Sequence, residues 1–169
     1  FVFGEYIFPV TTLRPETIFG ITNLWVNPNT IYKKLTVDGQ KWIVSKECAY
    51  KLEFFDKEIT VDGDIAGSDI IGKYAKTHDG RDIPILPADF VEPRMGTGLV
   101  MSVPGHAPKD YQALMDLKAN NHELAVKIEP ISIIVTEGYD KFPAKQICEK
   151  LGVTDQSDEK LEEATKELY

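Results

Sequence analysis

Short runs of β-prone residues dominate this chain and most constrain its fold. Each run carries Val, Ile, Thr or aromatic residues and is bounded by turn residues, which is the pattern of short strands joined by turns. The runs are 2–10, 22–27, 33–45, 58–64, 83–91, 98–103 and 128–135. The pairs Asp38-Gly39 and Asp62-Gly63 are hairpin signals, and the first has the cleaner apolar flanks.

Helical patterns are fewer and lie between or after these runs. They cover 45–55, 108–121, 143–153 and 157–169. Ser45 is a candidate N-cap, and Pro143 and Gly152 follow the usual rule of Pro at the start and Gly past the end. Many short strands with a few helices predict a mostly β or α+β fold, a β-barrel decorated with peripheral helices.

The composition sets the broad class. The chain has 169 residues, of which 43% are hydrophobic, so we expect one domain, 1–169, with a full core. No apolar run is long enough to cross a bilayer. The start has neither an initiator Met nor a basic region, so we expect a domain excised from a longer protein rather than a signal peptide. Cys48 and Cys148 are isolated and are expected to be buried free thiols of a cytoplasmic protein.

The net charge of −8 argues against a broad basic face for nucleic acid. Much of the acid lies between residues 53 and 69, where a solvated surface is the simplest explanation. Any nucleic acid is therefore expected to be held locally. The three histidines share no ligand spacing with each other or with cysteine, so no metal site is expected.

The stretch TTLRPET, residues 11–17, gathers hydroxyls and a guanidinium after a predicted strand. Pro15 favours extended geometry at Arg14 and opens a helical turn at 16–18. Taken alone, the stretch is explained as a capped helical turn, because Thr and Glu are common at helix starts.

The stretch GTGLVMSVPGHAPKD, residues 96–110, carries polar side chains directly after an apolar run. Pro108 at the first helical position places Asp110 near the third, where the helix dipole and backbone N–H groups favour an acid. The Gly-rich start lacks the Lys-Ser/Thr of a P-loop. Ser102, His106 and Asp110 are evenly spaced, but no nucleophile-elbow sequence surrounds Ser102, which disfavours a serine-hydrolase triad.

Together, TTLRPETIFG and GTGLVMSVPGHAPKDYQAL resemble the editing domain of class I aminoacyl-tRNA synthetases for leucine, isoleucine and valine. The Leu within the first motif, WVNP, and the sequence from 138 onward point to the archaeal and eukaryotic type of leucyl-tRNA synthetase. The resemblance implies a small Greek-key-like β-barrel that hydrolyses the aminoacyl ester of tRNA-Leu mischarged with isoleucine, methionine or norvaline. The adenylation signatures are absent, so we expect no aminoacylation by this chain.

The resemblance also implies the site residues. Asp110 is expected to hold the α-ammonium of the wrong amino acid, and Thr12 and Arg14 to lie near the ester and the terminal adenosine; Asp110 and Thr12 are the candidate catalytic residues. Thr17 is expected to limit the pocket so that leucine is refused. The full predicted substrate-binding set is Thr11, Thr12, Leu13, Arg14, Thr17, Met101, Val103, His106 and Asp110.

Partners and alternatives follow from the same resemblance. The expected partners are the 3′ end of tRNA-Leu and the rest of the synthetase, with a monomeric domain and no membrane. Editing is expected to need no cofactor, whereas ATP and Mg serve the parent enzyme's synthetic site. His106 either hydrogen-bonds the attacking water or braces its loop. Ala107 stands where many bacterial members carry a second Asp, which leaves open an inactive module that binds the tRNA acceptor end or a protein.

Overall fold

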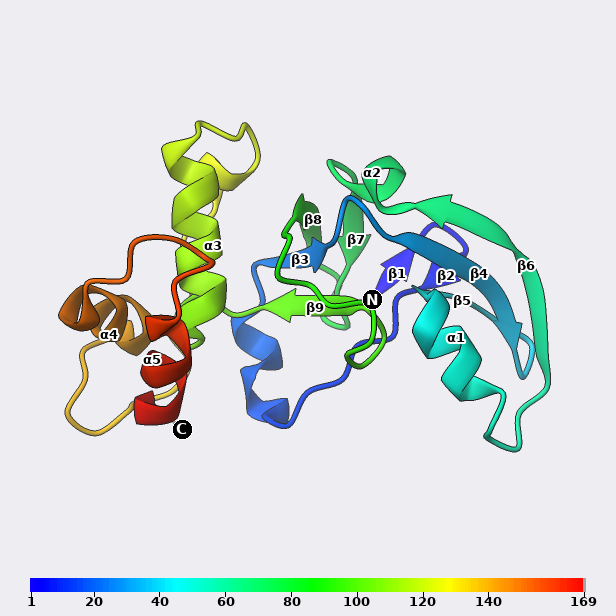
Figure 1. The fold of residues 1–169 in the computed structure, drawn as a ribbon, viewed down its shortest axis with the longest axis horizontal. Helices are drawn as coiled ribbons and strands as arrows, with labels where there is room; N and C mark the ends of the chain where they lie inside the picture. Colours follow the sequence, from blue (N-terminus) through cyan, green and yellow to red (C-terminus); the bar gives the residue numbers. More distant parts are fainter. Residues whose placement is uncertain (169) are drawn as a thin grey trace. The chain divides into compact units, whose positions relative to one another are not determined.

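The computed structural model describes residues 1–168, and Tyr169, the end of the predicted helix 157–169, lies outside the described residues (Figure 1). The chain divides into two compact units. The first comprises Phe1–Thr12 and Asn23–Met101, and the second comprises Leu13–Thr22 and Ser102–Tyr169. The two sequence motifs therefore each contribute residues to both units.

In the described part of the chain, nine strands form one curled mixed sheet, in the order β6-β4-β5-β2-β1-β7-β8-β3-β9. The strands are β1 (Val2–Phe3), β2 (Tyr6–Ile7), β3 (Asn23–Val26), β4 (Ile31–Val37), β5 (Gln40–Ser45), β6 (Ile59–Ala66), β7 (Tyr74–Lys76), β8 (Asp82–Pro87) and β9 (Leu99–Ser102). The pairs β2–β5 and β3–β8 are parallel. The predicted class, a mostly β or α+β fold with a β-barrel and peripheral helices, is confirmed, and the sheet has the form of a curled half-barrel.

The hairpin predicted at Asp38-Gly39 is confirmed. Val37 of β4 pairs with Gln40 of β5, so the two residues between them form the whole turn. Asp38 has φ 47° and Gly39 has φ 80°. Positive φ at both central residues is the geometry of a type I′ turn, whose twist matches that of the flanking strands.

The hairpin predicted at Asp62-Gly63 is wrong, because this pair lies inside β6. Lys34 of β4 pairs with Gly63 and the next residue, Leu35, pairs with Val61, so the register shifts and Asp62 is the extra residue of a β-bulge. Gly63 has φ 147°, which an L side chain rarely adopts. The Asp-Gly signal thus marks a bulge rather than a chain reversal.

Two helices of the first unit follow its strands: α1 (Lys46–Leu52) and α2 (Gly67–Ile70). Ser45 is the N-cap of α1, as predicted, and its Oγ accepts the Cys48 N–H at 3.1 Å. The helix ends at Leu52, before the predicted end at Phe55. The apolar face of α1 packs on β4 and β5, around Leu35, Val37, Val44 and Cys48.

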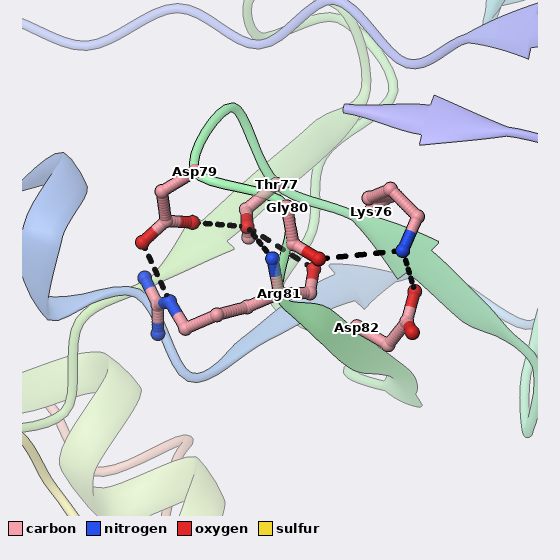
Figure 2. Close-up of polar contacts among 6 residues, drawn as sticks. All are labelled: Lys76, Thr77, Asp79, Gly80, Arg81 and Asp82. Atoms are coloured by element: carbon pink, nitrogen blue, oxygen red, sulfur yellow. Dashed lines mark hydrogen bonds and ion pairs between the residues drawn. The ribbon is translucent and has the colours of Figure 1, made fainter.

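A dense set of polar contacts fixes the connection between β7 and β8 (Figure 2). Thr77 Oγ1 donates to the Asp79 carboxylate and accepts the Arg81 N–H at 2.9 Å. Arg81 Nε donates to Asp79 Oδ2 at 2.8 Å. The Thr77 hydroxyl and the Arg81 guanidinium lower the pKa of Asp79 to about 2. These contacts are all local to the turn, so we assign them a structural role.

The second unit is helical. Its elements are η1 (Pro15–Gly20), α3 (Pro108–Ala119), η2 (Ala125–Lys127), α4 (Pro143–Leu151) and α5 (Lys160–Leu168). Helices α3, α4 and α5 lie together (Figure 1) around the cluster Tyr111, Ala144, Ile147, Cys148, Leu161 and Ala164. The predicted helices at 108–121 and 143–153 are confirmed with slightly shorter bounds. Gly152 ends α4 in the left-handed conformation, with φ 64°.

The strand predicted at 128–135 is wrong. Residues 128–135 run without ladder pairing, between η2 and α4. Pro130 lacks the N–H that a ladder needs. The β-prone composition instead suits an extended segment, which is held by contacts to the turn before α3, described below. We call residues 130–136 the PISIIVT segment.

The two cysteines and the possible metal ligands were also considered in the sequence. Cys48 and Cys148 are both buried and free, as predicted. Burial raises the pKa of Cys148 to about 12, so this thiol stays protonated. Among residues 1–168, no three His, Cys, Asp or Glu side chains are grouped as metal ligands, and no helix is long and apolar enough to span a membrane.

Candidate functional site

A tight turn at the end of β9 leads into α3 and carries the polar residues of the second motif. The N–H groups of His106 and Ala107 both donate to the Val103 carbonyl, at 3.0 and 2.9 Å. Pro108 then starts α3 with its fixed φ. The turn therefore holds His106 and the start of α3 in a defined position relative to Val103.

Asp110 lies at the third position of α3, as predicted, and its carboxylate accepts a hydrogen bond from outside the helix. Its Oδ2 accepts the Val103 N–H at 2.8 Å, and the residue is only 6% exposed. Ala107 is the N-cap and forms no side-chain cap bond. The carboxylate is thus fixed by the helix on one side and by the residue after β9 on the other, close to the positive end of the helix dipole.

Thr17 lies buried in η1, the helical turn that Pro15 was predicted to open. Its N–H and its Oγ1 both donate to the Arg14 carbonyl, at 3.0 and 2.7 Å. Because the Oγ1 position is fixed, the direction of the γ-methyl is fixed as well. Arg14 Nε donates to Glu16 Oε1 at 3.0 Å.

The PISIIVT segment contacts this turn through a histidine. The Ile133 N–H donates to His106 Nε2 at 3.0 Å, and His106 is 3% exposed. Burial, and secondarily the charge of Arg14, lower the pKa of His106, which favours the neutral ring. Nε2 must be unprotonated to accept, so the proton of the neutral ring is assigned to Nδ1. This geometry favours the loop-bracing role for His106.

Two glycines allow the PISIIVT segment to approach. A Cβ on Gly105 would lie 2.3 Å from the Ile131 carbonyl oxygen. A Cβ on Gly20 would lie 3.1 Å from both Ile133 Cδ1 and Val103 Cγ1. The backbone of Gly105 and the Cα of Gly20 are therefore in close contact with the segment.

The structure distributes the predicted site residues over both units. The second unit brings Thr17, Val103, His106 and Asp110 onto η1 and the turn before α3, whereas Leu13 is fully exposed. Thr11, Thr12 and Met101 belong to the first unit, and Met101 is buried. The roles of all these residues stay predictions.

The first unit also joins parts of the two motifs. A Cβ on Gly96 would lie 2.7 Å from Thr11 Oγ1, so the threonine packs on the Gly-rich turn.

The serine-hydrolase arrangement of Ser102, His106 and Asp110 is not formed. Ser102 Oγ is buried without a hydrogen-bond partner among the described residues, so it makes no bond to His106.

Sequence reasoning missed Ile133, Gly20 and Gly105. The two glycines carry no chemistry of their own, and Ile133 lies 27 residues from His106 in a stretch predicted to be a strand. The Pro-Gly pair directly before His106 was the only local signal for this contact. It indicates a turn but does not indicate which segment packs on that turn.

Comparison with known proteins places this arrangement in a class. The family model described as "Leucyl-tRNA synthetase, editing domain" matches residues 4–166. The leucine–tRNA ligase of Pyrococcus horikoshii is 50% identical over 98% of this chain and 19% of its own length. That of Methanothrix thermoacetophila is 47% identical over 100% of this chain and 18% of its own length. This chain thus spans about a fifth of the length of these relatives.

Solved structures agree on the fold. The crystal structure of GlLeuRS-CP1 superposes with a TM-score of 0.84 at 28% identity, over 97% of this chain and 68% of that one. The P. falciparum cytosolic leucyl-tRNA synthetase editing domain gives a TM-score of 0.85 at 23% identity, over 97% and 66%, which shows the fold alone. The chain belongs to the leucyl-tRNA synthetase editing-domain family and is similar to its archaeal-type members.

Proposed function

We propose that this chain hydrolyses the aminoacyl ester of tRNA-Leu that carries a wrong amino acid, after its transfer to tRNA. The observation that carries the proposal is the Asp110 carboxylate, buried and fixed by the Val103 N–H at 2.8 Å. A carboxylate held this way is a rigid partner for the α-ammonium that every aminoacyl ester carries. Membership of the editing-domain family supports the same reading.

Physical chemistry explains why a leucine enzyme needs such a site. Leucine and isoleucine differ only in where a methyl group branches, norvaline lacks one methyl group of leucine, and methionine is an unbranched thioether of similar size. A difference of one methyl or methylene group is worth about 1–3 kcal/mol in an apolar pocket. One round of selection cannot reject them sufficiently. A second site solves this problem if it excludes leucine and hydrolyses the esters of the amino acids that it binds. The buried Thr17, whose methyl direction is fixed, is suited to form the pocket wall that excludes leucine.

The proposed reaction is a simple hydrolysis. The oxygen of a water molecule attacks the ester carbonyl carbon, the bond from that carbon to the ribose oxygen breaks, and the ribose oxygen takes a proton. The free amino acid and intact tRNA leave. Because the aminoacyl ester is already activated, positioning of the water and the ester contributes more than a strong base.

The proposed roles follow the two motifs. Asp110 binds the ammonium, and Thr12 and Arg14 lie near the ester and the terminal adenosine. Thr17 excludes leucine. The remaining proposed substrate-binding residues are Thr11, Leu13, Met101 and Val103, and His106 braces the loop beside them through its bond to Ile133.

The same proposal names the partners. The single-stranded 3′ end of tRNA-Leu is the substrate, and the rest of a leucine–tRNA ligase supplies the other tRNA contacts, which fits a net charge of −8 on this chain. We propose that editing uses no cofactor, that ATP and Mg act at the ligase's synthetic site, and that the protein is monomeric and works in the cytoplasm.

The test is deacylation of preformed Ile-, Met- and norvalyl-tRNA-Leu without ATP, with Leu-tRNA-Leu as the matched control. We expect rapid release of the three wrong amino acids and slow release of leucine. Equal rates with and without protein would overturn the proposal. Ala107 favours one alternative, a module that binds without hydrolysing; it predicts binding of a non-hydrolysable aminoacyl-adenosine analogue together with no deacylation.

A further inference from the structure

The PISIIVT segment is held against η1 and the turn before α3 by three separate contacts. Its backbone N–H at Ile133 donates to His106 Nε2 at 3.0 Å. Its carbonyl at Ile131 fits against the Cα of Gly105, where a Cβ would come within 2.3 Å. Its Ile133 side chain lies at Gly20 and Val103. Three contacts of different kinds define the position of this segment within the second unit.

Ile133 borders the same surface as Thr17. Residues three apart in a 3₁₀ helix lie on one face, so Thr17 and Gly20 share a face of η1, and both are buried. The space beside the Gly20 Cα is filled by Ile133 Cδ1 and Val103 Cγ1. Val103 is itself a proposed pocket residue. The wall that begins at Thr17 therefore continues through Val103 to Ile133.

We propose that Ile133 is a specificity-determining residue of this site, and that His106 is the positioning residue that sets it through the hydrogen bond from the Ile133 N–H to Nε2. This inference rests on the proposed editing function. It extends the pocket wall to a segment that neither sequence motif contains.

The hydrogen bond acts on the side chain through the backbone. Fixing the N–H of Ile133 fixes the orientation of its peptide group, and with it the direction of the Cα–Cβ bond. Only a ring nitrogen without a proton can accept this bond, because both nitrogens of a protonated imidazole are donors. His106 contributes to specificity in this way without touching the ester.

The first experiment changes the size of the wall. Ile133→Val and Ile133→Ala are compared with the wild type for deacylation of preformed Ile-tRNA-Leu and Leu-tRNA-Leu by the intact protein. We expect the rate ratio of the isoleucyl to the leucyl substrate to fall by about tenfold for Ala and by less for Val, because the enlarged pocket admits leucine. Ile147→Val is the matched control, since it removes the same methylene from the helical cluster of the same unit.

The second experiment changes the side chain at position 106, which accepts the hydrogen bond from the Ile133 N–H. The side-chain oxygen of Gln reaches the place of Nε2, whereas that of Asn reaches only the place of Nδ1. We expect His106→Gln to keep the rate ratio of the wild type, and His106→Asn to lower it as Ile133→Ala does. A structural role alone would lower the melting temperature of the Asn variant without changing the ratio.

The outcomes separate this inference from the function on which it rests. If the wild type does not deacylate Ile-tRNA-Leu, the proposed function fails. If the wild type is active and both Ile133 variants keep its rate ratio, the assignment of Ile133 is wrong. If the Ile133 variants change the ratio and His106→Asn does not, the positioning role of His106 is wrong.

Discussion

Replacement of Asp110 separates the structural from the functional role of one carboxylate. In Asp110→Ala, the Val103 N–H loses its acceptor in a residue that is 4% exposed. An unsatisfied buried donor costs about 1–3 kcal/mol, and loss of an acid at a helix start costs about 0.3–1 kcal/mol more. The total of about 1.3–4 kcal/mol corresponds to a fall in melting temperature of about 3–16 °C for a chain of this size.

Asp110→Asn is the informative partner variant, because its amide oxygen can still accept the Val103 N–H while its charge is gone. We expect a melting temperature within about 4 °C of the wild type, set by the lost charge at the helix start. Deacylation, however, loses the partner of the substrate ammonium. Loss of one member of a buried charge pair costs about 3 kcal/mol, or roughly a hundredfold in kcat/KM.

The assay pairs thermal unfolding with deacylation kinetics on Ile-tRNA-Leu for both variants. If the Asn variant is as unstable as the Ala variant, the bond to Val103 does not hold the carboxylate as the structure shows. If the Asn variant is stable and deacylates at the wild-type rate, Asp110 does not bind the ammonium.

Two further predictions concern Thr17 and His106. Thr17→Ser keeps the hydroxyl that bonds the Arg14 carbonyl but lacks the methyl, so we expect it to hydrolyse Leu-tRNA-Leu about tenfold faster than the wild type. Thr17→Val keeps a methyl in the pocket and is expected to refuse leucine still. The opposite result for the two variants would assign the exclusion of leucine to the hydroxyl. The pKa of His106 is lowered by burial and by Arg14, so the unfolded chain binds its proton more tightly. The contribution of neutral His106 to the free energy of unfolding should be fully present above about pH 6.5 and should be lost as the pH falls through the lowered pKa. Melting temperatures measured over this pH range should fall less for His106→Gln than for the wild type.

The sequence was most informative where local rules and packing agree. The Asp38-Gly39 turn, the Ser45 cap and the Pro-to-Gly span of α4 each depend on a few adjacent residues, and all are confirmed. The same Asp-Gly signal failed at Asp62, because pairing of β6 with β4 over its full length turned the extra residue into a bulge. Such pairing depends on a distant strand, which a local pattern does not contain.

In the candidate site, too, the features that depend on adjacent residues were predicted and the contacts with distant residues were not. The helical turn at Thr17 and the position of Asp110 at the start of α3 followed from Pro15 and Pro108. The bond from Val103 to Asp110 did not, because the helix-start rule directs an acid to N–H groups of its own helix. Ile133 could not be predicted for another reason. A run rich in β-branched residues predicts a strand, and nothing in it reveals that a histidine replaces the neighbouring strand as the hydrogen-bond acceptor.

The bond at His106 also bears on the solubility of the protein. The segment it holds is rich in Ile and Val, has no charged residue from Pro130 to Thr136, and has no sheet partner in the described fold. Uncharged β-branched stretches of this length are the ones that stack into cross-β aggregates once they are released. The imidazole occupies one of the backbone donors through which such stacking would begin, so loss of this bond is expected to favour pairing of the stretch with other chains.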